Sequence, residues 1–144
     1  MSVKKAEELF YKGYSCAQSV VGAFASEVGL TEEEALAVSA CFGAGICATR
    51  GICGALSGTL MITGLIEKWT TPEQKPVAYE KGKEIMDEFV KEFAHINCAE
   101  LLEECGATYS EVPSERTEEY YASRPCLGII KFCAALLENR LKNN

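Results

Sequence analysis

ICGALSGTLMITGLI, residues 52–66, is apolar around nearly the whole of its helical wheel. A helix without a polar face belongs in the interior of a protein, because every side of it must be removed from water. The glycine-rich stretch GAGICATRG, residues 43–51, comes directly before this segment and predicts a compact loop. We therefore predict a central helix at residues 52–66 that is buried on every side.

Capping signals and the spacing of apolar residues predict further helices before this segment. Residues 2–12 consist mostly of helix formers. Ser15 begins a second helix, which Gly29 ends. Thr31 opens a third helix, through a capping box, and this helix is expected to run to about Cys41.

Three more helices are expected after the central segment. Residues 77–95 have one apolar face opposite lysines and glutamates, residues 97–106 form a short helix, and Pro125 begins the last helix. Residues 107–124 are a polar connection, which is either a functional loop or contains a helical turn at residues 118–122.

The fold class follows from these elements and from the composition. No segment alternates for long between apolar and polar residues, so no sheet is expected. With 144 residues, of which 48% are hydrophobic and 24% are charged, the chain has the composition of one globular domain. The sequence predicts an all-α fold, a compact bundle of about six to seven helices with a central buried helix, as a single cysteine-rich domain over residues 1–144.

Charge and hydropathy limit the partners and the location of the protein. The net charge of −7 and the isoelectric point near 4.8 argue against a nucleic-acid partner, because phosphate binding needs clustered lysine and arginine. The first residues are polar where a signal peptide would be apolar, and there is no run of about 18 apolar residues. We expect a cytoplasmic protein without membrane contact. Symmetric pairing is common and the apolar content is high, which favours a homodimer.

The eight cysteines are the strongest compositional signal. In a reducing compartment, dense cysteine indicates metal binding, redox chemistry or burial as small hydrophobic residues, rather than structural disulfides. No Cys-x-x-Cys motif occurs, which excludes thioredoxin-type motifs, common zinc knuckles and covalent haem attachment. A functional set of cysteines must therefore assemble in space.

Four cysteines stand at predicted helix starts: Cys16, Cys53, Cys98 and Cys126. The unpaired N–H groups and the positive dipole end of a helix start lower the pKa of a thiol below its usual value of about 8.5. Thiolates are the better nucleophiles and metal ligands. These four residues are therefore the candidate catalytic thiols, and the candidate ligands if a metal or cluster is bound.

The remaining cysteines give weaker signals. Cys41, Cys105 and Cys133 are expected to be buried small hydrophobic residues. Cys47 lies in the glycine-rich loop, with five residues between it and Cys53, and is an additional candidate ligand if the loop folds back.

Gly51 and Gly54 flank the Cys53 position and are the candidate cofactor-binding residues, since their backbone can approach a neighbouring helix or surround the sulfur with N–H groups. His95 is the only histidine, so the multi-histidine sites of catalytic zinc and iron enzymes are excluded, and a surface role is expected.

Four segments in order carry a family resemblance: GYSCAQ (13–18), CGALSG (53–58), NCAELL (97–102) and Cys126. Together they resemble the C_GCAxxG_C_C family of redox-active proteins. The resemblance implies a helical domain in which Cys16, Cys53, Cys98 and Cys126 form the redox or cluster-binding set. Related domains resemble the cysteine-bearing part of certain multihaem cytochromes that hold an iron–sulfur cluster, although this chain has no haem attachment sequence.

Three hypotheses about function stay open at this point. The first is a thiol–disulfide or electron-transfer protein, an oxidoreductase if it is an enzyme, that works with an unidentified redox partner. The second is a protein that binds an iron–sulfur cluster through three or four of the same cysteines. The third is a helical interaction module whose cysteines only fill the core.

Overall fold

The computed structural model describes residues 2–104, 116–118, 121 and 125–143. These residues contain seven α-helices and no strand, which confirms the all-α prediction. The α-helices are α1 (Ser2–Tyr11), α2 (Cys16–Ala23), α3 (Glu32–Val38), α4 (Gly54–Glu67), α5 (Lys75–Phe93), α6 (Cys98–Glu104) and α8 (Cys126–Lys142). Three 3-10 helices, η1 (Ser26–Val28), η2 (Ala40–Phe42) and η3 (Pro72–Gln74), lie between them.

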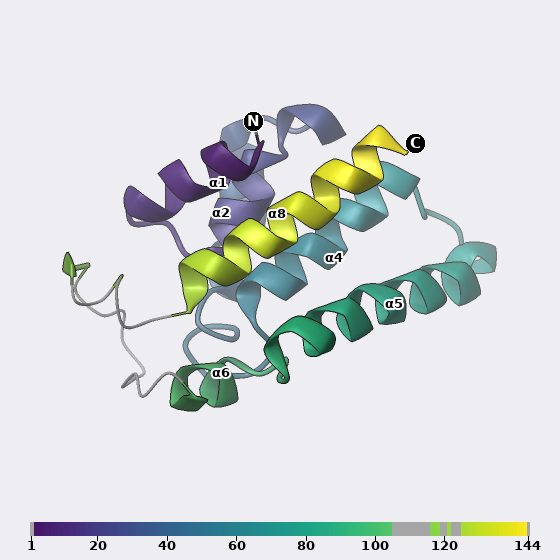
Figure 1. Cartoon of the computed structure of the whole chain (residues 1–144). Coiled ribbons are helices and arrows are strands. Elements are labelled where there is room, and N and C mark those ends of the chain that lie inside the picture. The colour runs from purple at the N-terminus through teal and green to yellow at the C-terminus, as the bar shows by residue number, and fades with distance from the viewer. Residues whose placement is uncertain (1, 105–115, 119–120, 122–124, 144) are drawn as a thin grey trace.

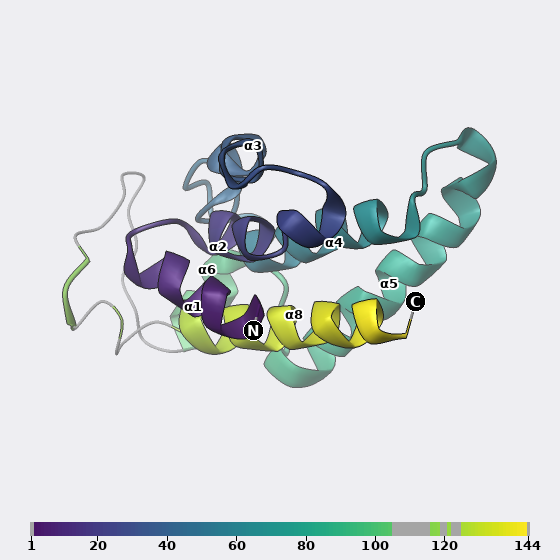
Figure 2. The same cartoon turned by 90° about the horizontal axis from the view of Figure 1, so that it is seen from above.

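The helices pack around α4. This helix contacts α2, α8 and α5, while α1 packs against both α2 and α8 (Figure 1). Viewed from above, α1 and α8 lie at one face of the molecule and α3 lies at the other, against α2 (Figure 2). None of the described helices is both long enough and apolar enough to span a bilayer.

The central helix is buried on most of its surface but not on all of it. Leu56 and Ile62 are fully buried, whereas Leu65 is 41% exposed, so the prediction of burial on every side is wrong. The neighbours α2, α8 and α5 therefore leave part of α4, at Leu65, open to solvent. Gly58 explains the close approach of α2, because a Cβ atom there would lie 3.0 Å from Val21 Cγ2.

Local capping signals place the first helices. The Ser15 hydroxyl accepts a hydrogen bond from Gln18 N, and the Gln18 side chain accepts one from Ser15 N, both at 3.2 Å. Thr31 makes the same reciprocal arrangement at the start of α3, as predicted. Both helices end earlier than expected, at Ala23 and Val38, and a short 3-10 helix follows each of them after one or two residues.

The later helix boundaries also differ by a few residues from the predictions. The helix α4 begins at Gly54 because Ile52 is held extended by pairing with Asn97. The last helix begins at Cys126, with Pro125 as its N-cap. The predicted turn at residues 118–122 lies partly outside the described residues. Within them, Tyr121 N donates to Thr117 O at 3.2 Å.

Candidate functional site

The four candidate cysteines all lie at helix starts in the structure. Cys16, Cys98 and Cys126 are the first residues of α2, α6 and α8, and Cys53 is the N-cap of α4. No disulfide joins any two of the seven cysteines in the part of the chain that the structure describes, and Cys105 lies outside that part. The prediction that these four cysteines lie at helix starts is therefore correct. The four sulfurs differ in the groups that contact them.

Cys16 and Cys53 form a hydrogen-bonded thiol pair where α2 meets the start of α4. The Cys53 thiol donates to the Cys16 sulfur, which also accepts the backbone N–H groups of Ala17, Ala44 and Ala55. These three amides come from α2, from the glycine-rich loop and from the first turn of α4. One sulfur therefore collects donors from three separate segments, an arrangement that stabilises an anion.

The two thiols respond to this arrangement in opposite directions. The hydrogen bond from Cys53 is the largest cause that lowers the pKa of Cys16 from 9.0 to about 6, with the three amides adding to it against the cost of burial. The same hydrogen bond, burial and the nearby Cys16 charge raise the pKa of Cys53 above its ordinary value. At neutral pH, Cys16 is therefore a thiolate and Cys53 keeps its proton.

Gly54 is the residue that lets the two helices meet at this point. A Cβ atom on Gly54 would lie 2.6 Å from the Phe42 carbonyl oxygen and 2.8 Å from Cys16 Sγ, closer than real contacts allow. Gly51 instead acts through its backbone, whose carbonyl accepts Cys98 N–H at 2.7 Å. Both glycines thus position cysteines in the structure, and their contact with a cofactor stays a prediction.

The glycine-rich loop presents Ala44 through an unusual backbone conformation. Residues 44–48 all have positive φ, as does Arg50, and of these six residues only Gly45 is a glycine. Left-handed backbone costs an L-residue about 1–2 kcal/mol, so the loop needs compensating bonds. Hydrogen bonds from Arg50 N to Ala44 O, at 3.0 Å, and from Gly51 N to Gly45 O, at 2.9 Å, supply part of this compensation.

Cys133 is a third thiol close to the pair, and sequence reasoning missed its position. It is 1% exposed, which confirms the predicted burial. Burial raises its pKa to about 12, although its contact with Thr59 opposes the change, and the charge of Cys16 adds to the rise. The sequence carries no local signal for this approach, because it depends on how α8 packs against α2 and α4.

Cys98 lies beside Cys53 along the backbone but in a different chemical environment. Cys53 N donates to Ile96 O and Cys98 N donates to Gly51 O, both at 2.7 Å. The residues that lead into α4 and those that lead into α6 therefore run antiparallel to one another. The Arg50 guanidinium donates to Cys98 Sγ at 3.6 Å. A cation therefore accompanies Cys98, whereas Cys16 is held by amides and a thiol.

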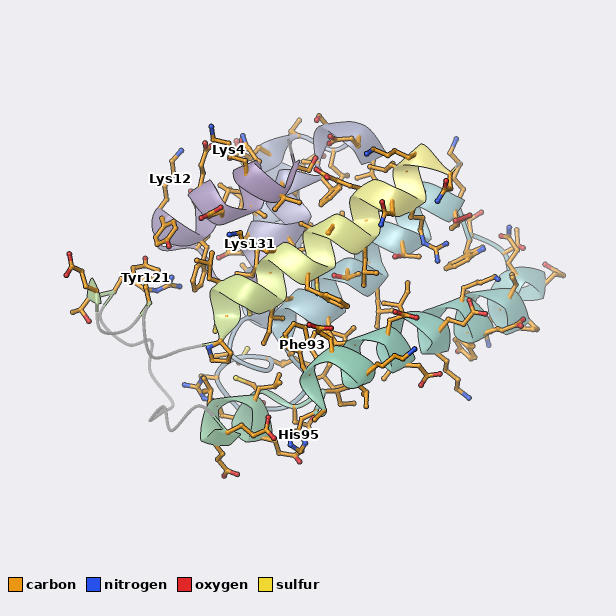
Figure 3. All side chains as sticks on the ribbon, viewed as in Figure 1. Lys4, Lys12, Phe93, His95, Tyr121 and Lys131 are labelled. Atoms are coloured by element: carbon orange, nitrogen blue, oxygen red, sulfur yellow. The ribbon has the colours of Figure 1, made fainter. Side chains whose placement is uncertain are left out.

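Cys41, Cys47 and His95 are exposed or partly exposed, unlike the buried Cys53. Cys41 is exposed, so its predicted burial is wrong; η2 turns this residue outward. Cys47 is also exposed. His95 lies just beyond α5 and contacts Glu100 and Glu104 of α6, each at 3.1 Å (Figure 3). It is partly exposed, and it links two helices rather than joining the thiols.

Comparison with known families identifies the chain. The family described as "Putative redox-active protein (C_GCAxxG_C_C)" matches residues 14–140. The chain belongs to this family. The C_GCAxxG_C_C match includes Cys16, Cys53, Cys98 and Cys126, so the cysteine pair described above lies within the region that the family shares. No curated protein and no solved structure matches the chain.

The low pKa of Cys16 predicts a specific pH dependence. Alkylation of Cys16 in the folded chain should reach half its maximal rate near pH 6, and in the urea-unfolded chain near the unshifted value of 9.0. Mass spectrometry of the peptide that contains Cys16, after timed labelling, measures both curves. Coincident curves for the folded and unfolded chains would contradict the assignment.

The same shift predicts the sign of a stability change. Because the folded pKa of Cys16 is lowered, its contribution to the free energy of unfolding is complete above pH 9.0, falls with decreasing pH and is lost through about pH 6. The raised pKa of Cys133 acts oppositely, since its contribution is complete below pH 9.0 and is lost as pH rises toward about 12. Urea unfolding of wild type and Cys16→Ser from about pH 5.5 to about pH 9 tests the Cys16 window. The difference in the free energy of unfolding between the two proteins should shrink as the pH falls.

Proposed function

We propose that this C_GCAxxG_C_C family member is a thiol–disulfide redox protein in which Cys16 and Cys53 cycle between dithiol and disulfide. The observation that supports it is the hydrogen bond of the Cys53 thiol to a Cys16 sulfur that three backbone amides also hold. This arrangement supplies a thiolate nucleophile and a protonated second thiol in direct contact. Those are the two groups that disulfide exchange needs.

The first step would use the Cys16 thiolate. It attacks one sulfur of a substrate disulfide, the substrate S–S bond breaks, and one substrate thiolate leaves and takes up a proton. Cys16 is then joined to the other half of the substrate and no longer carries a negative charge. That charge is one of the causes of the raised pKa of Cys53, so its loss makes the Cys53 thiol easier to ionise.

The second step would use Cys53. Its thiolate attacks the Cys16 sulfur, the mixed disulfide breaks, and the second substrate thiol leaves with the proton that Cys53 gave up. The substrate has gained two electrons and two protons. Both electrons come from the Cys16–Cys53 pair, whereas one proton comes from Cys53 and the other, taken up by the first leaving thiolate, comes from solvent. A dithiol reductant would return the pair to its reduced form by the reverse exchange.

The other two motif cysteines differ in how far the structure supports a role. Cys98 has a guanidinium donor and begins α6 next to the backbone bridge between Ile52 and Asn97, which suits exchange with an external redox partner. We assign no step to Cys126, which lies partly buried at the start of α8. The redox partner itself and the homodimer stay predictions.

The iron–sulfur alternative fits the arrangement less well. Among the residues that the structure describes, no three His, Cys, Asp or Glu side chains are grouped so that they could hold a metal ion. The thiols of Cys16 and Cys53 are hydrogen-bonded to one another, and the Cys98 sulfur accepts a hydrogen bond from Arg50. A cluster ligated by these thiols with Cys126, or with Cys47 as a further ligand, would need them to rearrange, and we derive no step through it.

Oxidation mapping tests the proposed function. We expect reduced protein, treated with a glutathione redox buffer, to form a disulfide that joins tryptic peptide 13–50, which contains Cys16, to peptide 51–68, which contains Cys53. A second digestion with chymotrypsin, which cleaves after Phe24 and Phe42, separates Cys16 from Cys41 and Cys47. Mass spectrometry then identifies the bonded pair.

Two results, one from a spectrum with metal analysis and one from the peptide mapping, would oppose the proposal. Visible absorption together with bound iron and sulfide in anaerobically purified protein supports the cluster hypothesis instead. Protein without colour or metal, whose Cys16 and Cys53 never pair and whose Cys53→Ser variant changes only in stability, supports the interaction module. Cys133→Ala is the matched control, because it removes a nearby buried thiol that the exchange steps do not use.

A further inference from the structure

Cys41 and Cys47 form a second pair of cysteines, outside the C_GCAxxG_C_C set. Both are exposed, whereas Cys53 is only 6% exposed. Cys41 belongs to η2 and Cys47 to the left-handed loop that follows it. An external disulfide can therefore reach these two thiols directly.

The backbone brings the two residues close enough for a covalent bond. Cys47 N donates to Cys41 O at 2.8 Å, and the Cys47 thiol donates to the same oxygen at 3.4 Å. The 2.8 Å bond puts the backbones of the two residues in direct contact, and disulfides form between residues whose Cα atoms lie about 4.4–6.8 Å apart. The sulfur of Cys47 thus lies against the carbonyl group of Cys41, the residue to which it would bond.

We propose that Cys41 and Cys47 are a second, surface-exposed dithiol that is oxidised by disulfides of the glutathione class. One of the two thiols, as its thiolate, attacks the external disulfide and forms a mixed disulfide while one external thiol leaves. The other cysteine then displaces the second external thiol. The external disulfide gains two electrons and two protons, and Cys41 and Cys47 become one disulfide.

The position of this bond in the chain gives it a consequence for the loop. The bond would close a ring that contains Ala44, whose N–H group donates to Cys16. Closing the ring would limit the alternative conformations of a segment in which residues 44–48 are all left-handed. The oxidised surface pair would therefore hold the loop in the conformation that the structure shows.

Peptide mapping of the full-length chain tests this second dithiol. Reduced protein is treated with oxidised glutathione, alkylated, and digested with trypsin and chymotrypsin. Cleavage after Phe42 separates the two cysteines, so their disulfide joins peptide 25–42 to peptide 43–50. We expect this joined form to exceed the glutathione adducts of Cys41 and Cys47 by at least about tenfold, because the second displacement is intramolecular.

Single surface variants provide the matched control. Cys41→Ser should leave Cys47 as a lasting glutathione adduct, and Cys47→Ser should do the same for Cys41. Persistent adducts on both residues in the wild type, unreacted thiols, or a bond from either residue to the Cys16 peptide would overturn the proposal. This measurement does not depend on Cys53, so the surface pair and the Cys16–Cys53 pair succeed or fail separately.

Discussion

Cys16→Ser is expected to reduce disulfide exchange at the buried pair by about 10³-fold or more, because a serine hydroxyl is not ionised at neutral pH and cannot replace a thiolate nucleophile. The effect should be largest near pH 7. There, a Cys16 pKa of about 6 keeps the thiol mostly ionised. The rate is measured as reduction of a small disulfide under a dithiol reductant.

The background for this experiment is the double variant Cys41→Ser and Cys47→Ser, which removes the two exposed thiols of the loop. The double variant alone is the matched control, and it should keep the exchange rate of the Cys16–Cys53 pair. Cys16→Ala and circular dichroism separate a chemical effect from a folding defect. Exchange that survives in a folded Cys16 variant within about twofold of the control would remove Cys16 from the mechanism.

The helix starts were predictable because each depends on a few neighbouring residues. Ser15 with Gln18 and Thr31 with Glu34 form capping boxes that involve one turn of chain, and such local signals survive in most tertiary contexts. The candidate thiols could be chosen for the same reason, since a cysteine that follows a cap lies in the first turn of a helix.

The chemistry of the site could not be predicted in the same way. The contact between Cys16 and Cys53 depends on how α2 packs on α4, and the sequence states nothing about which helix ends meet. The outward turn of Cys41 depends on η2, a 3-10 helix that replaces the expected last turn of the third helix. Ser39 contributes there, because its buried hydroxyl donates to Ala35 O at 2.7 Å and competes with regular helical bonding.

The left-handed loop shows the limit of local reasoning most directly. Its glycines predict a turn, but Ala44 also adopts positive φ, with a value of 51°. Alanine has no intrinsic preference for that region, so long-range contacts must hold it there. The donor that this residue offers to Cys16 was therefore invisible in the sequence, although it helps to decide which cysteine is the thiolate.

Gly54→Ala is expected to destabilise the fold by about 1–3 kcal/mol, as overpacking of a close contact does, and to raise the pKa of Cys16. The added methyl group would lie 2.6 Å from the Phe42 carbonyl oxygen, which is backbone and cannot rotate away, and 2.8 Å from Cys16 Sγ. Relief requires α2 and the loop to move from α4. That movement lengthens the hydrogen bonds from Ala44 and Ala55 that favour the thiolate.

Gly64→Ala in the same helix is the matched control. A Cβ atom at Gly64 meets nothing within 4 Å, so this change should stabilise the chain by about 0.5–1 kcal/mol through helix propensity alone, with no change at Cys16. Urea unfolding and the pH profile of Cys16 alkylation give the two readouts. Because a helix effect alone would move both variants in the same direction, opposite signs assign the loss in Gly54→Ala to the close contact with Phe42 and Cys16, and a raised Cys16 pKa in that variant alone assigns part of it to the thiol. Equal gains would show that Cys16 does not need this close approach.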